Sequence, residues 1–172
     1  MPLPMPEKIQ KTVQSNLTPG QIIAKHQQSA PINVMAIAND LGLNVWSMNL
    51  PGNISGKIFR DALNGGTSGF SIAVNAKESP VRQRFTIAHE IAHFILHRTN
   101  LETGDLIDDT MYRSGLSSAE ESAANSLAAD ILMPFPLIQK FITAGMKDVP
   151  SLAAAFQVSQ VAMKIRLGIP VT

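Results

Sequence analysis

The pattern of apolar and polar positions along the chain predicts two short helices near its beginning. Helical spacing over residues 19–26 follows Thr18-Pro19, a pair that is typical of a helix start. A second helical pattern runs from Val34 to Leu41 and stops at Gly42, which suits the end of a helix. After this glycine the period changes.

Between residues 43 and 75 the apolar runs become short, as is typical of strands. Three β-type runs, at residues 44–48, 55–60 and 69–75, are separated by turns that are rich in glycine and asparagine. The last run alternates apolar and polar side chains, so we expect a half-buried strand with one face toward solvent. The region predicts a small antiparallel sheet, whose edge could pair with an extended peptide.

The next segment, residues 80–97, predicts a long helix that begins at Ser79-Pro80. The segment is apolar nearly all round, except for a stripe formed by Thr86, His89, Glu90, His93 and His97. Burying such a stripe is costly unless its polar groups have partners, and a metal ion would be one. Residues 98–116 are rich in turn-forming types and predict a long loop.

Within this helix, residues 89–93 form the pattern H-E-x-x-H. Side chains four positions apart share one face of a helix, so His89 and His93 can direct two imidazoles at one ion. The spacing suits Zn²⁺. Glu90 follows the first histidine and can take a proton from a water molecule at the ion. We therefore predict one zinc ion with Glu90 as the catalytic base.

A catalytic zinc site usually has three protein ligands, so a third ligand is needed. The chain has no cysteine, which leaves histidine or a carboxylate. His97 is excluded because ligands at i, i+4 and i+8 spread along about 12 Å of helix axis. We expect His97 either to support the site from outside the ligand set or simply to lie near the helix C-terminus, where the helix dipole favours a histidine.

A predicted helix over residues 117–134 offers Glu120 and Glu121 as the third ligand. We favour Glu121, because Asn125 lies one turn later and can hydrogen-bond a ligand on the same face. Ser118 and Glu121 also fit a capping box, in which Glu121 would bond only a backbone N–H. That interpretation leaves the histidines without a third ligand, and Glu120 stays open. Tyr112, before this helix, could donate to an oxyanion.

Composition and charge narrow the class of protein. Apolar residues make up 45% of the chain, charged residues 16%, and the formal net charge is +1. These values indicate a globular protein and give no electrostatic basis for binding nucleic acid. Early prolines interrupt any secretion signal, and no apolar run approaches the ~20 residues of a membrane helix. We expect a cytoplasmic protein.

Two motifs resemble those of the ImmA/IrrE family of zinc metallo-endopeptidases. They are RFTIAHEIAHFILH and, further along, ESAANSLAADILMP; the tail LAAAFQVSQVAMKIRL is similar to the family's usual ending. The resemblance implies a gluzincin-like peptidase in which Glu121 matches the family's metal-binding glutamate. It also implies that the substrate is a DNA-binding helix-turn-helix repressor encoded nearby, whose cleavage derepresses genes in a stress or mobile-element response.

Together these elements predict an α+β fold that is mostly helical. A small three-stranded antiparallel sheet would pack beside the H-E-x-x-H helix in a zincin-like core. We expect a flexible arm over residues 1–18 and the peptidase core over residues 19–134. A helical extension over residues 135–172 would pack on the same domain.

Two other functions compete with peptidase activity. The tail over residues 151–168 resembles a helix-turn-helix, with Lys164 and Arg166 on its second helix. Two basic residues are fewer than the phosphate contacts that DNA binding needs, so we do not expect direct binding to nucleic acid. The other hypothesis is a zinc-containing regulatory module, or a toxin–antitoxin component, that does not cleave a substrate.

Overall fold

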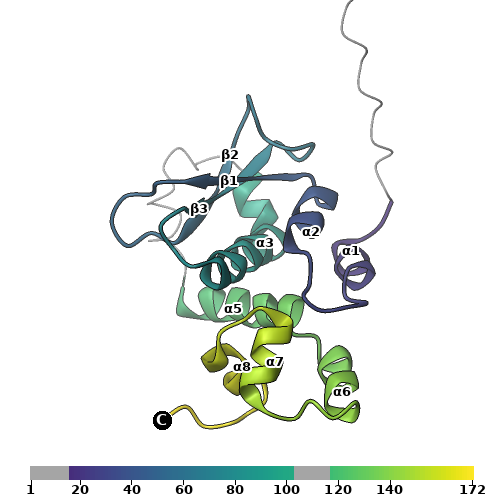
Figure 1. Ribbon diagram of the computed structural model, residues 1–172. Helices are drawn as coiled ribbons and strands as arrows, with labels where there is room; N and C mark the ends of the chain where they lie inside the picture. Colours follow the sequence, from purple (N-terminus) through teal and green to yellow (C-terminus); the bar gives the residue numbers. More distant parts are fainter. Residues whose placement is uncertain (1–15, 103–116) are drawn as a thin grey trace, which may run out of the picture.

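The computed structural model describes residues 16–102 and 117–172, arranged as a sheet stacked on successive layers of helices (Figure 1). The helices are α1 (Pro19–Lys25), α2 (Val34–Asp40), α3 (Pro80–Glu102), α5 (Ser118–Leu132), α6 (Phe135–Thr143), α7 (Val149–Phe156) and α8 (Gln160–Arg166). The strands are β1 (Leu43–Met48), β2 (Gly56–Arg60) and β3 (Phe70–Asn75). The fold is α+β and mostly helical, which confirms the prediction.

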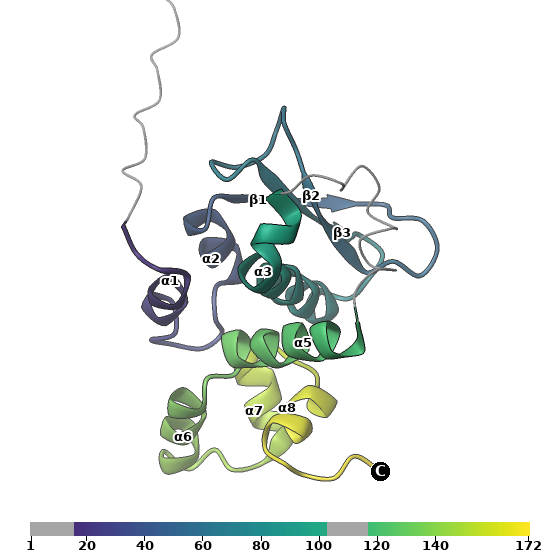
Figure 2. The same ribbon diagram turned by 180° about the vertical axis from the view of Figure 1, so that it is seen from behind.

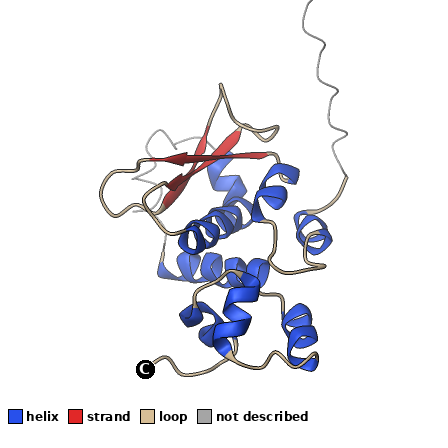
Figure 3. Cartoon of the chain, in the orientation of Figure 1, coloured by secondary structure: helices blue, strands red, loops and turns tan. Residues whose placement is uncertain are grey.

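The long helix α3 lies between the sheet and α5, and α6, α7 and α8 cover the other side of α5 (Figures 1 and 2). Strands therefore gather at one end of the molecule and the C-terminal helices at the other (Figure 3). The core between these layers contains fully buried aliphatic side chains from each of them, including Ile72, Ile91, Ile131 and Leu152. None of the described helices is both long enough and apolar enough to cross a bilayer.

Side-chain caps begin the helices at the predicted residues. Thr18 and Gln21 form a reciprocal capping box at the start of α1, followed by Pro19. The Ser79 hydroxyl accepts a hydrogen bond from the Arg82 N–H at 3.3 Å, at the start of α3. These local signals explain why both helix starts could be predicted from sequence.

The sheet has the strand order β1-β3-β2 and is mixed. β2 runs antiparallel to β3, but β1 runs parallel to it, so the expectation of a purely antiparallel sheet is wrong for β1. The reason is topological. β1 and β2 run in opposite directions and β3 lies between them, so β3 must be parallel to one of its neighbours.

Both faces of β3 are buried. All six of its residues are buried, so the prediction of a face toward solvent is wrong. Its polar side chains are hydrogen-bonded instead. The Ser71 hydroxyl accepts from Trp46 Nε1 at 3.1 Å and donates to Asp61 Oδ2 at 2.8 Å. The Asn75 amide donates to the Ile54 carbonyl at 3.0 Å. Partners of this kind make burial of polar groups tolerable.

The helix α3 continues beyond the residue at which a loop was expected. His97 has non-helical dihedral angles (φ −124°, ψ 17°), and helical backbone resumes after it up to Glu102. The prediction of a loop is therefore wrong for residues 98–102. The rest of that segment, which contains Tyr112, lies outside the described residues.

Arg84 ties α3 to two distant segments of the chain. Its guanidinium donates to the carbonyl oxygens of Ile32 (2.9 Å), Gln157 (3.3 Å) and Phe156 (3.4 Å). Burial lowers its pKa, although arginine stays charged in proteins. Because Phe156 and Gln157 end α7, Arg84 satisfies carbonyl groups that a helix end leaves open. It thereby fixes α7 against α3.

Arg166 anchors α8 to the end of α5 in the same manner. Its Nε donates to the Met133 carbonyl at 2.8 Å, and its Nη1 lies 2.7 Å from Asp130 Oδ1. The guanidinium also lies over the Phe135 ring, 3.9 Å from its centroid. The two arginines together hold the helix pair α7–α8 beside α3 and α5.

Gly56, the first residue of β2, lets the sheet approach α3 closely. A Cβ atom at this position would overlap the Thr86 Cγ2 atom and would lie 2.8 Å from the Ala73 carbonyl oxygen. Neither neighbour is the free end of a flexible side chain, so both the strand and the helix would have to shift. The glycine therefore sets the distance between β2 and α3.

We predict that Gly56→Ala destabilises the protein by about 1–3 kcal/mol through overpacking. The measurement is the free energy of unfolding from urea denaturation. Gly20→Ala is the matched control, because no atom lies within 4 Å of its Cβ position. It lies in α1, so the control should be neutral or stabilising by up to about 1 kcal/mol. Equal stability of the two variants would contradict the close approach at Gly56.

Candidate metal centre

Side chains from α3 and α5 bring three possible metal-binding atoms together. His89 Nε2 and His93 Nε2 lie 2.9 Å apart. The Glu121 carboxylate faces both, with Oε2 at 3.3 Å from His89 Nε2 and Oε1 at 3.2 Å from His93 Nε2. These are the three residues that could hold a metal among the described part of the chain.

The geometry and chemistry of these donors fit a divalent ion of the zinc type. Bonds of about 2.0–2.1 Å around a tetrahedral ion place neighbouring donor atoms about 3.3–3.4 Å apart. The observed separations of 2.9, 3.2 and 3.3 Å are close to this range. Two imidazole nitrogens and one carboxylate also match the donor set of a catalytic zinc site, which keeps a fourth position open.

The packing of α3 on α5 explains why Glu121 reaches the histidines. His89 and His93 are one helical turn apart, and their rings are nearly perpendicular, with centroids 4.5 Å apart. On α5, Ala124 and Ala128 share the face of Glu121 and have no exposed surface. Small side chains let two helices lie close together. The short Glu121 side chain can therefore extend across to α3.

The structure also distinguishes the two neighbouring glutamates. Glu120 closes a capping box with Ser117: its Oε2 accepts from the Ser117 N–H at 2.7 Å, and its own N–H donates to the Ser117 hydroxyl at 3.2 Å. These bonds from the Ser117 backbone and hydroxyl lower the pKa of Glu120. The capping box therefore starts at Ser117, so the alternative in which Glu121 only caps the helix with Ser118 does not apply, and Glu121 faces the histidines.

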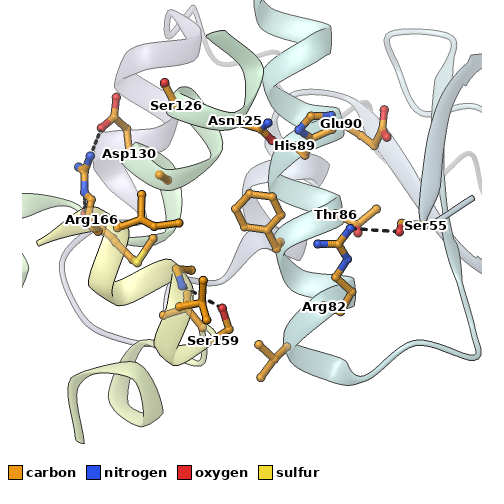
Figure 4. A pocket seen from close by; sticks show the side chains of 18 of the residues that line it. Ser55, Arg82, Thr86, His89, Glu90, Asn125, Ser126, Asp130, Ser159 and Arg166 are labelled. Atoms are coloured by element: carbon orange, nitrogen blue, oxygen red, sulfur yellow. Dashed lines mark hydrogen bonds and ion pairs between the residues drawn. The ribbon is translucent and has the colours of Figure 1, made fainter. Parts of the chain in front are cut away.

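Glu90 follows His89 in α3 and is almost inaccessible. Its residue is 1% exposed, yet it lines the same cleft as His89 and Glu121. In Figure 4 its carboxylate extends from α3 toward the sheet, away from α8. A carboxylate in this position, next to a metal ligand, is suited to exchange a proton with a reactant in the cleft.

The other predicted site residues have different surroundings. Asn125 lines the cleft one turn after Glu121. His97 lies next to His93, with ring centroids 5.4 Å apart, but it is not among the three possible ligands. It marks the break in α3. Tyr112 is outside the described residues, so its expected role stays a prediction.

The donor atoms open into a cleft of about 980 Å³ between α3, α5, α8 and the segment before β2. Ser55, Arg82 and Thr86 lie on the sheet side of α3, and α8 forms the opposite wall (Figure 4). Sequence reasoning did not find this wall. Its only signal was a pair of apolar residues, Val161 and Ile165, one turn apart on the last helix.

Comparisons with known proteins agree with this fold. The model of the IrrE N-terminal-like domain (Peptidase_M78) matches residues 38–168. The chain therefore belongs to the ImmA/IrrE family, as its motifs predicted.

Two curated relatives are the radiation response metalloproteases IrrE of Deinococcus radiodurans and Deinococcus deserti. The chain is 41% identical to the first over 71 residues and 40% identical to the second over 73 residues. These matches cover 41% and 42% of this chain, but only 21% and 25% of the two relatives.

A solved structure, a Mycobacterium tuberculosis transcriptional regulator, shares the fold. Its TM-score is 0.56 at 16% identity, and the match covers 88% of this chain and 46% of that chain. At this identity the similarity concerns the fold alone.

We predict that Glu121→Gln weakens zinc binding by more than about 100-fold. Replacing a residue that only hydrogen-bonds to a metal ligand typically lowers the affinity for the metal by about 10–100-fold, and replacing a ligand itself should lower it further. The measurement is a chelator competition titration on the purified protein. Glu120→Gln is the matched control and should bind zinc as the parent protein does, since Glu120 caps α5. Loss of zinc in the Glu120 variant but not in the Glu121 variant would reverse the assignment.

Proposed function

We propose that the chain is a zinc-dependent endopeptidase that hydrolyses a peptide bond in a partner protein. The observation that carries the proposal is the meeting of the donor atoms of His89, His93 and Glu121 at a cleft that His89, Glu121 and Glu90 line. Membership of the ImmA/IrrE family supports it, and so does the name metalloprotease of the two curated relatives.

In this proposal His89, His93 and Glu121 hold the ion. When bound, zinc supplies Lewis acidity that polarises a scissile carbonyl and makes water more acidic. Glu90 takes the proton of the attacking water and later delivers it to the leaving amine. Its burial supports this role, because a carboxylate with little access to bulk solvent exchanges protons with the reactants rather than with water outside the cleft.

The free edge of the sheet offers a way to orient the substrate. At the two ends of β2, the Asp61 N–H donates to the Gly69 carbonyl and the Ser55 carbonyl accepts from the Asn75 N–H. The backbone groups of odd-numbered residues in β2 therefore face β3. The backbone groups of Gly56 and Ile58 therefore point away from β3. Within the described residues β2 is an edge strand. An extended peptide could pair with this edge beside α3.

We further propose that the partner protein is a helix-turn-helix repressor encoded near this gene, whose cleavage derepresses genes. The resemblance to the ImmA/IrrE family supports this choice.

The competing hypothesis that α8 reads DNA has less support from the structure. Arg166 is engaged by Asp130 and by the Met133 carbonyl. The exposed side chains of α8 include Val161 and Ile165, which are apolar. Phosphate binding needs several accessible cations. A gel shift of duplex DNA by the purified protein, decreasing with salt, would favour the competing hypothesis.

We predict that Glu90→Gln keeps zinc and loses cleavage by a factor of about 10²–10⁴, the usual contribution of a general acid–base. The variant is co-expressed with the transcriptional regulator encoded beside the gene, and shortened regulator is detected by mass spectrometry. Glu120→Gln is the control for a glutamate-to-glutamine change and should cleave normally. A Glu90→Gln variant that cleaves as fast as the parent protein would rule out the proposed mechanism.

A further inference from the structure

The end of the cleft beside α8 differs in chemistry from the end beside the sheet. Its walls are apolar and come from three helices and the turn before α8. We call this end the α8 subsite. It is formed by Phe85, Met133, Val158, Val161, Ala162 and Ile165.

The helix α8 presents apolar side chains on two faces. Met163 is fully buried and anchors one face in the core. Val161 and Ile165, one turn apart on another face, are 51% and 66% exposed and line the cleft. Large apolar side chains that stay exposed inside a cavity are typical of a binding surface.

The charges around the α8 subsite cancel one another. Asp130 and Arg166 form an ion pair at 2.7 Å, and Arg166 also bonds the Met133 carbonyl. The other guanidinium of the cleft, Arg82, lies on the far side of α3 near Ser55 (Figure 4). A charged side chain entering the α8 subsite would lose hydration without gaining a free counter-ion. A neutral, apolar side chain loses nothing of this kind.

The α8 subsite is also close enough to the donor atoms to hold part of the same molecule. Phe85 lies one turn before His89, and the centroids of their rings are 6.4 Å apart. One extended residue spans about 3.3 Å. Two or three residues of an extended peptide would therefore bridge the donor atoms and the α8 subsite. In an extended peptide alternate side chains point to the same side, so one of them can enter the α8 subsite.

We propose that the α8 subsite receives a large aliphatic or aromatic side chain of the substrate, within about two or three residues of the scissile bond. The helix α8 is then a wall of the substrate cleft that determines specificity. The inference rests on the proposed peptidase function of the same site. It adds the class of residue that the enzyme selects.

The test measures binding rather than cleavage. Three probes carry a hydroxamate, which anchors them at the metal, joined to a capped dipeptide whose variable residue is leucine, glycine or glutamate. Isothermal titration of zinc-loaded Glu90→Gln protein gives their dissociation constants. The leucine probe should bind about tenfold or more tightly than the glycine probe. The glutamate probe should bind no more tightly than the glycine probe.

Two variants place a charge in the α8 subsite without disturbing the core, since both residues are exposed. In Val161→Glu and in Ile165→Glu, each made in the Glu90→Gln protein, the advantage of leucine over glycine should disappear. Acetohydroxamate, which lacks a side chain, should bind all variants equally. Met35→Glu is the matched control: Met35 is 49% exposed on α2, away from the cleft, and its variant should keep the preference.

Equal binding of the leucine and glycine probes would overturn the proposal, and so would a preference that survives both α8 variants. Failure of every probe to bind would overturn it as well, because the subsite is defined for a molecule anchored at the metal. Cleavage of the regulator by wild-type protein is scored separately. Cleavage without an apolar preference would support the peptidase function and contradict the α8 subsite. An apolar preference without cleavage would support the α8 subsite and contradict the peptidase function.

Discussion

The packing of α3 against α5 is the contact on which the rest of the structure depends. α3 is apolar nearly all round, yet it carries His93 and Glu90 in positions that are 2% and 1% exposed. Burial of such groups is favourable only where partners are near. The fold meets this condition by turning the polar stripe toward a cleft and by setting Glu121 of α5 against the two histidines. The sheet, held close by Gly56, covers the other side of the helix.

The position of the cleft wall follows from a second constraint, the open carbonyl groups at helix ends. Arg84 of α3 donates hydrogen bonds to the open carbonyl groups at the end of α7, and Arg166 of α8 donates one to a carbonyl group at the end of α5. Each arginine reaches across to an element far away in the sequence. Because a guanidinium offers several donors in a fixed plane, it fixes orientation as well as distance. The same bonds that stabilise the C-terminal helices therefore determine the shape of the cleft beside the candidate metal centre.

These constraints explain which features could be predicted from the sequence. Helix starts at Thr18 and Ser79, and the shared face of His89 and His93, depend on neighbours within one turn and were accessible. The direction of β1 depends on strand order, and the burial of β3 depends on what packs over the sheet; no local pattern encodes either. The choice between Glu120 and Glu121 depended on whether the cap starts at Ser117 or at Ser118, and the sequence fits both.

The C-terminal helix pair illustrates why a motif alone does not decide function. The sequence of the two short helices around residues 157–159 resembles a helix-turn-helix, but such a resemblance does not determine chemistry. One of its basic residues, Arg166, is used to hold the fold together. Val161 and Ile165, in contrast, contribute little to the core because they are exposed. Substitution at these two positions would alter the cleft at little cost in stability.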